Sequence, residues 1–200
     1  MTRATYIRAI GYMGLIASAL SIALILFADL TVAGNDMVAD TISAMAAGER
    51  YWYADAGIYA LAFAFAVLGL GMAAVHPGGL FWSFATFGYT ALGGLIFLIG
   101  FRNEYGDSDA ETGEVVHFSL VVILGIIMAI TAWCSIRGTR ELAQNLSARS
   151  ITLASIWTIG APAFFILPTG YDGLYERGLG LVAIAIAATM AQVLLTNEKR

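Results

Sequence analysis

The chain has 200 residues, of which 60% are apolar and 12% are charged, and its formal net charge is −4. A soluble domain carries about a quarter charged residues, so this composition excludes an ordinary soluble fold. The mean hydropathy of +0.80 indicates long apolar segments. About 20 residues per membrane crossing leave room for a single transmembrane domain over residues 1–200 and for short loops.

Six apolar runs are long enough to cross the roughly 30 Å hydrocarbon core of a bilayer. A backbone in lipid must satisfy its own hydrogen bonds, so each run is predicted to be an α-helix. The sequence therefore predicts an all-α, polytopic membrane protein built as a six-transmembrane-helix bundle. The runs cover residues 7–31, 53–75, 80–101, 115–136, 151–167 and 178–195.

The loop between the first two runs, residues 34–52, has a helical pattern of its own. Apolar residues recur at helical spacing between a polar residue that can cap a helix and a glycine that can end it. These residues are Asn35 or Asp36, Val38, Ile42, Met45 and Gly48. The pattern predicts a short amphipathic helix on the outer membrane surface or over the mouth of the bundle. A structural plug and a functional lid are both consistent with it.

Basic residues lie mainly on one side of the predicted bundle. Of the ten Lys and Arg residues, Arg50, Arg102 and Arg177 fall on one side, and the other seven accompany the termini and the loop between the fourth and fifth runs. Positively charged loops stay in the cytoplasm, so we expect both termini to be cytoplasmic, in a bacterial inner (plasma) membrane. Of the fourteen acidic residues, only Glu141 and Glu198 fall on this inner side, which makes the outer face acidic.

Charge is absent from the middle of every predicted span. Ionisable groups at that depth are typical of proton relays, ion pathways and voltage sensors. The sequence therefore argues against a proton-coupled transporter, a voltage sensor and a proton channel, and leaves a passive lipid path open. Basic residues cluster only in the short inner loop, so no nucleic-acid partner is expected.

Polar residues lie at the outer helix ends, beginning with Asp29 on the first helix. A compact bundle would bring these residues together, and we call this group the outer polar ring. The candidate binding residues of this ring are Asp40, Ser43, Asp55, Arg102, His117, Glu176 and Arg177. A histidine beside carboxylates and a serine suits general acid–base or metal-assisted hydrolysis. Zinc sites need several such ligands, and the outer side offers one histidine. Paired charges that close the bundle mouth are the structural alternative, and we expect no catalytic residue, no metal site and no cofactor.

Three stretches carry a family resemblance: the loop segment NDMVADTISAMAAGERYWYADAG, His117 at the start of the fourth helix, and YDGLYERG before the last helix. With six helices in one short chain, they resemble an uncharacterised bacterial six-helix membrane family known only as a domain of unknown function. That family is distantly grouped with the eukaryotic DRAM, Frag and Sfk-type proteins. The resemblance covers nearly the whole chain, and the matching positions are Asp40, Ser43, Asp55, His117, Glu176 and Arg177.

The resemblance implies a six-helix bundle whose functional residues lie in the outer loop and at the outer helix ends. It carries no established catalytic activity, and the eukaryotic relatives' connection with lipid handling and membrane organisation points to lipids. The chain also resembles, more loosely, the membrane hydrolases related to alkaline ceramidase, which use Ser, Asp and three His. This chain has only two His, on opposite faces in the predicted topology.

Three functions are consistent with the sequence. The first is a non-enzymatic integral membrane protein that binds membrane lipids or organises the membrane. The second is an auxiliary subunit packed against a larger respiratory or photosynthetic membrane complex, since small residues on helix faces make ready interfaces. The third is a membrane hydrolase that uses His117 with Asp40, Asp55 or Glu176.

Overall fold

The computed structural model describes residues 2–46, 52–101, 110–168 and 170–197, with the backbone alone for 110–115 and 197. Within these ranges the chain is all-α and has no strand, as the composition predicted. The elements are α1 (Arg3–Thr31), α2 (Ile42–Ala46), α3 (Trp52–Val75), α4 (Leu80–Phe101), α5 (Ala110–Leu142), the short 3-10 helix η1 (Gln144–Leu146), α6 (Ser147–Phe164) and α7 (Asp172–Asn197).

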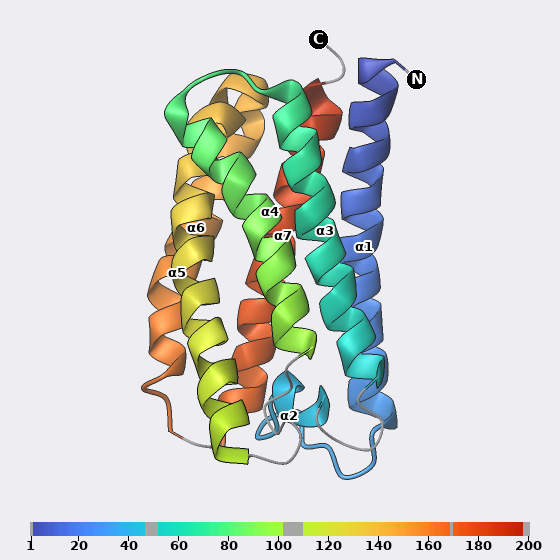
Figure 1. The fold of residues 1–200 in the computed structure, drawn as a ribbon, viewed down its shortest axis with the longest axis vertical. Helices are drawn as coiled ribbons and strands as arrows, with labels where there is room; N and C mark the ends of the chain where they lie inside the picture. The colour runs from blue at the N-terminus through green and yellow to red at the C-terminus, as the bar shows by residue number, and fades with distance from the viewer. Residues whose placement is uncertain (1, 47–51, 102–109, 169, 198–200) are drawn as a thin grey trace.

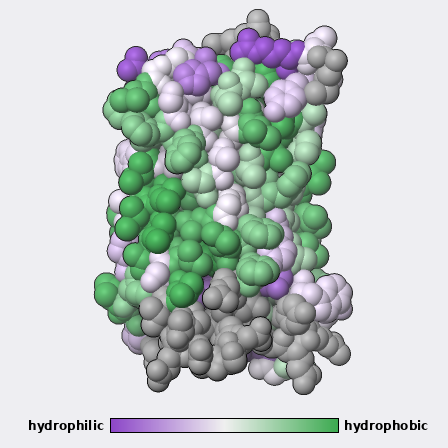
Figure 2. Space-filling view, in the orientation of Figure 1, coloured by the Kyte–Doolittle hydropathy of each residue, from purple (hydrophilic) through white to green (hydrophobic). Residues whose placement is uncertain are grey.

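Five helices among the described residues are long and apolar enough to cross a membrane: α1, α3, α4, α5 from Val116 onward, and α7. Figure 2 shows apolar side chains over the middle of the visible face and hydrophilic ones at the end that carries the termini. This is the surface pattern of a protein that spans a bilayer. These helices and this surface confirm the prediction of an all-α membrane protein.

The observed helix bounds depart most from the predicted ones in the second half of the chain. α4 covers residues 80–101 as predicted, whereas α5 runs past the predicted end at 136 to Leu142. Polar residues such as Arg137 and Arg140 continue this helix, since beyond the hydrocarbon core a helix needs no apolar side chains. α6 ends at Phe164, although the apolar run continues to 167, so apolar character alone does not fix a helix end.

The six long helices pack in a ring that follows the chain order. Each of α1, α3, α4, α5, α6 and α7 contacts the next, and α7 returns to contact α1. α7 also contacts α3 and α5. In Figure 1 both chain ends lie at one end of the bundle, and α2 lies at the other. A ring of this kind encloses an interior along its axis, which the helices fill to different degrees.

Small residues let the helices approach closely. A methyl group at Gly14 would lie 2.7 Å from the side chain of Leu68, and one at Gly93 would lie 2.8 Å from the carbonyl oxygen of Ala62. Glycine therefore sets the approach of α1 to α3 and of α3 to α4. Gly94 does not take part, because a methyl group there would meet nothing within 4 Å.

The loop helix α2 begins later than the sequence predicted. It starts at Ile42 and not after Asn35 or Asp36, because Thr41 accepts the hydrogen bond that caps it, from the Ala44 N–H at 3.0 Å. The cap of α2 is therefore Thr41, and Asp36 caps only the turn before it, where its Oδ1 accepts from the Val38 and Ala39 N–H groups. The predicted role of a surface helix or lid stays a prediction.

The short helix α2 packs onto the bundle. Met45 and Ala46 are buried against Ala28 of α1 and Ala54 of α3 in a small apolar cluster of their own. Burial of this apolar face holds the loop against the helix ends. The outer loop is consequently part of the wall of the bundle at this end.

Candidate functional site

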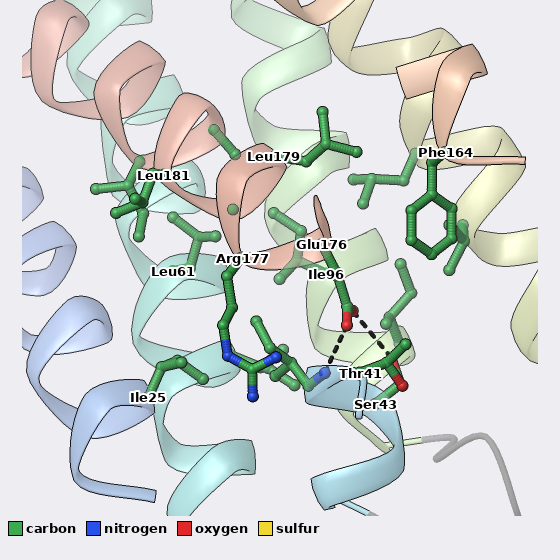
Figure 3. Close-up of a pocket in the computed structure, with 18 of the residues that line it drawn as sticks. Ile25, Thr41, Ser43, Leu61, Ile96, Phe164, Glu176, Arg177, Leu179 and Leu181 are labelled. Carbon is green, nitrogen blue, oxygen red and sulfur yellow. Dashed lines mark hydrogen bonds between the residues drawn. The ribbon is translucent and has the colours of Figure 1, made fainter. Parts of the chain in front are cut away.

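A cavity of about 930 Å³ lies inside the helix ring, toward the end that carries α2. Ligand pockets in proteins commonly measure about 300–1,000 Å³, so this one is at the upper end of that range. Figure 3 shows its walls, with Ile25 from α1, Leu61 from α3, Ile96 from α4 and Phe164 from α6. These walls are apolar. Polar side chains line the end nearest α2.

Small residues leave the space that forms the cavity. Gly125 of α5, Gly180 of α7 and Ala183 of α7 line it. A methyl group at Gly180 would meet no atom within 4 Å, and one at Gly125 would first meet Ala161 at 3.8 Å. At Gly14, by contrast, a neighbouring helix occupies the space beside the glycine. Here the facing helices stay apart, so the same residue type produces a void.

Part of the cavity lining is exposed. Leu26 of α1 and Leu181 of α7 both line it, and 49% and 55% of their surfaces are exposed. Phe118 of α5 and Phe165 of α6 also line it and are partly exposed. These four apolar side chains belong to two pairs of neighbouring helices, α1 with α7 and α5 with α6.

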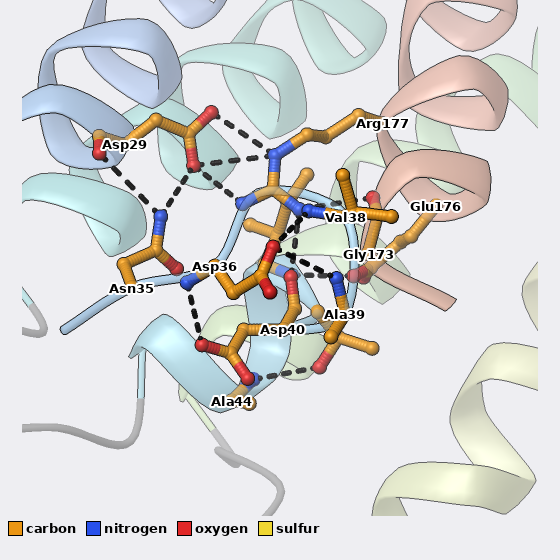
Figure 4. A network of polar contacts seen from close by, with 12 residues as sticks. Asp29, Asn35, Asp36, Val38, Ala39, Asp40, Ala44, Gly173, Glu176 and Arg177 are labelled. Atoms are coloured by element: carbon orange, nitrogen blue, oxygen red, sulfur yellow. Dashed lines mark hydrogen bonds and ion pairs between the residues drawn. The ribbon is translucent and has the colours of Figure 1, made fainter. Parts of the chain in front are cut away.

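An ion pair between α1 and α7 closes the polar end of the cavity (Figure 4). Arg177 Nε lies 3.0 Å from Asp29 Oδ2 and 3.2 Å from Oδ1, and its Nη2 also donates to Asp29. Its Nη1 donates to the carbonyl oxygens of Asp40 at 2.7 Å and Gly173 at 2.9 Å. The Asp29 side chain is fully buried and that of Arg177 is 11% exposed. Buried charges are tolerated when paired and hydrogen-bonded in this way.

Glu176, Ser43 and His117 form a second polar group at the same end. Glu176 accepts hydrogen bonds from the Ile42 N–H and from Ser43 Oγ, the latter at 3.3 Å (Figure 3). Ser43 Oγ also lies 3.1 Å from His117 Nε2. One serine hydroxyl on α2 thus connects a carboxylate of α7 with an imidazole of α5.

The loop before α2 is fixed by hydrogen bonds to itself and to α7. Asp36 Oδ1 accepts from the Val38 N–H at 2.9 Å, and Asp40 Oδ2 accepts from the Asp36 N–H at 2.8 Å. The Leu174 N–H donates to the Val38 carbonyl at 3.0 Å. A methyl group at Gly173 would collide with the Asp40 carbonyl, so glycine permits this close approach of α7.

The structure brings together four of the seven candidate binding residues of the outer polar ring. Ser43, His117, Glu176 and Arg177 all line the cavity. Asp40 contacts Arg177 through its backbone carbonyl, while its side chain stabilises the loop.

Asp55 and Arg102 are not part of this group. Asp55 does not line the cavity, and its buried Oδ1 has no hydrogen-bond partner among the described residues. Arg102 lies outside the described residues, as does Gly48, the predicted end of the loop helix. Within the described ranges no three His, Cys, Asp or Glu side chains are grouped as metal ligands would be.

The sequence did not predict the apolar cavity. It also did not predict the hydrogen bond that the Asn35 amide donates to Asp29 Oδ1 at 3.3 Å. Asp29 was recognisable as a charge at the end of the first helix, but its pairing with Arg177 was not. The signal available for the cavity was the pair of small residues Gly180 and Ala183 at helical spacing, which is also typical of close helix packing.

A family model described as "Protein of unknown function (DUF998)" matches residues 15–193 of the chain. No curated protein and no solved structure matches it.

Proposed function

The chain belongs to the DUF998 family of proteins of unknown function, and we propose that it is a lipid-binding membrane protein that holds an apolar lipid chain in its cavity. The observation that carries this proposal is the 930 Å³ cavity with apolar walls and a polar end, part of whose lining is exposed. Apolar walls with a few placed polar groups are the usual composition of a ligand site. An acyl or similar chain would lie between the walls, and its polar end would reach Ser43 and Glu176.

We also propose that α6 is the sixth membrane span. It has 18 residues, about 27 Å at 1.5 Å per residue, and packs between α5 and α7 in the ring. Near the start of α6, Arg149 donates a hydrogen bond to Gln192, near the end of α7. The opposite end of α6 leads to the start of α7, at the polar end of the cavity. Six spans place both termini on one side, which the basic residues assign to the cytoplasm of a bacterium.

A substitution that fills the cavity tests lipid binding. Gly180 lines the cavity and a methyl group there would meet no atom within 4 Å, so we expect Gly180→Leu to project its side chain into the cavity. Gly178→Leu is the matched control, since Gly178 is exposed on the outside of the same helix and also has no atom near its added methyl group. Both changes replace glycine within a helix, so both are expected to keep or slightly raise stability, by roughly 0.5–1 kcal/mol.

The measurement is the amount of lipid retained per protein after purification in mild detergent, by native mass spectrometry. We expect the wild-type protein and Gly178→Leu to retain a lipid and Gly180→Leu to lose most of it. Equal retention by all three proteins would place the lipid on the outer surface and contradict the proposal.

A second candidate function is hydrolysis of a lipid ester, favoured by the 3.1 Å contact between Ser43 Oγ and His117 Nε2 at the polar end of the cavity. In this scheme Ser43 Oγ bonds to the ester carbonyl carbon while its proton passes to His117, which returns it to the departing alcohol. Water then releases the fatty acid. This candidate is second because Glu176 contacts the serine hydroxyl, whereas in a Ser-His-Asp triad the acid contacts the imidazole.

The two functions differ in their response to Ser43→Ala. If the protein only binds lipid, purified protein releases no fatty acid from monooleoylglycerol, and Ser43→Ala still retains lipid. If it is a hydrolase, fatty acid is released and Ser43→Ala abolishes the release. An activity that survives Ser43→Ala would contradict this second candidate.

A further inference from the structure

The single strong cation that lines the cavity is already paired within the protein. Among the described lining residues Arg177 is the only Lys or Arg. Its Nε and Nη2 donate to Asp29, and its Nη1 donates to two backbone carbonyls. Arginine recognises phosphate or carboxylate through a fork of parallel donors, and here that fork holds Asp29. An anionic head group would have to displace a carboxylate that is fully buried.

Besides Arg177, the ionisable residues that line this end are Asp29, His117 and Glu176, and the two carboxylates work against an anion. Glu176, the residue before Arg177, lines the cavity and accepts hydrogen bonds from the Ile42 N–H and from Ser43 Oγ. An ionised carboxylate is an acceptor only, so it attracts a donor and repels a phosphate. The net charge of this end is negative as well. In the predicted topology it carries twelve of the fourteen acidic residues and only three of the ten basic ones.

The neighbouring groups also favour a ligand that can both donate and accept. Ser43 has a hydroxyl that donates and accepts, and His117 Nε2 lies 3.1 Å from it. A lipid hydroxyl can donate to the Glu176 carboxylate in place of Ser43, and it can then accept the hydrogen that the Ser43 hydroxyl no longer donates to Glu176. A phosphate diester or a carboxylate brings acceptors alone. The polar end and the apolar walls together therefore fit an uncharged amphiphile with a hydroxyl head.

We propose that the lipid held in the cavity is uncharged and carries a hydroxyl at its polar end, as a monoacylglycerol or a long-chain alcohol does, and that anionic phospholipids are disfavoured. This proposal rests on the proposed lipid-binding function and specifies its ligand class. Such a lipid would enter from the bilayer between α1 and α7 or between α5 and α6, where exposed side chains line the cavity.

The test compares two lipids with the same chain. Monooleoylglycerol and its phosphate ester, oleoyl lysophosphatidic acid, are titrated separately into delipidated protein in a non-ionic detergent, and binding is measured by native mass spectrometry. Because like charges brought together oppose binding, we expect the uncharged lipid to bind about tenfold or more tightly. Gly180→Leu should weaken its binding, which shows that the bound lipid lies in the cavity.

A charge-neutralising variant identifies the cause of the preference. Glu176→Gln keeps the shape of the side chain and removes the negative charge, so we expect the discrimination against lysophosphatidic acid to fall several-fold. Glu141→Gln is the control, because Glu141 is paired with Arg137 at the exposed end of α5, and it should leave the preference unchanged.

Each outcome decides a different claim. Equal or tighter cavity binding of lysophosphatidic acid overturns the ligand class while lipid binding stands. A preference that Glu176→Gln leaves unchanged overturns the electrostatic explanation. Binding of neither lipid, or binding that Gly180→Leu does not alter, overturns the lipid-binding function itself.

Discussion

At the scale of single residues, the Arg177–Asp29 pair is the contact that fixes the polar end of the bundle. It connects α1 with α7, and both side chains are almost completely withdrawn from solvent. A buried pair contributes little net stability over a well-packed apolar pair, but removal of one partner leaves an uncompensated charge. The consequence of a substitution therefore depends on whether one or both residues change.

We predict that Arg177→Leu lowers the free energy of unfolding by about 3–5 kcal/mol, since Asp29 stays buried without its partner. The double change Asp29→Leu with Arg177→Leu should recover most of that loss. Arg137→Ala is the control, because its pair with Glu141 is exposed, 78% and 46% for the two side chains, and should cost less than about 1 kcal/mol. Denaturation in detergent micelles measures all three. A double variant no more stable than Arg177→Leu would contradict this account.

The charges of this end could be predicted from the sequence, but their pairing could not. Helices of known length place Ser43, His117, Glu176 and Arg177 near one depth, so their gathering follows from the apolar runs. The choice of Asp29 as the partner of Arg177 depends on how α1 and α7 rotate against each other. Asp40, which the sequence offers equally, supplies its backbone carbonyl instead.

At the scale of helices, the adjacent glycines of α4 show what a sequence pattern leaves undecided. Gly93 and Gly94 look equivalent in the sequence, yet successive residues of a helix point about 100° apart. Gly93 faces α3 at the distance of backbone contact, and Gly94 faces away from every neighbour. Apolar runs predict that a helix exists and where it crosses the membrane. They do not predict which face meets which partner.

We predict that Gly93→Ala destabilises the protein by about 1–3 kcal/mol, because its methyl group would overlap the Ala62 carbonyl and α3 would have to move. Gly94→Ala should be neutral or stabilising by up to roughly 1 kcal/mol, since alanine favours the helix and fills open space. Thermal unfolding of the two variants in the same detergent makes the comparison. If both variants lost stability equally, the observed packing of α3 on α4 would be wrong.

At the scale of the whole molecule, the ring places both termini at one end and the loop with α2 at the other. The excess of basic residues at the termini predicts that this end is cytoplasmic. In a background with Cys134→Ser, a cysteine at Ala33, exposed beside the outer loop, should react with an impermeant maleimide in intact cells. A cysteine at Gln144, exposed between α5 and α6, should react only after the membrane is opened. The reverse pattern would invert the orientation.

The cavity could not be predicted from the sequence. Its volume arises where Gly125, Gly180 and Ala183, on two helices, face a space that no neighbour fills. Elsewhere similar small residues produce tight contacts, so composition does not separate the two outcomes. The alternative of an auxiliary subunit in a respiratory or photosynthetic complex stays a prediction.

The most direct test of the central claim is photo-cross-linking with a fatty acid that carries a diazirine near the end of its chain, fed to cells and incorporated into their lipids. We expect adducts inside the cavity, on partly buried residues such as Leu61 and Leu124 that line it. Gly180→Leu should remove these adducts and leave those on the outer surface. Adducts confined to outward residues such as Leu70 and Ile130, both more than half exposed, would contradict the claim that the cavity holds a lipid chain.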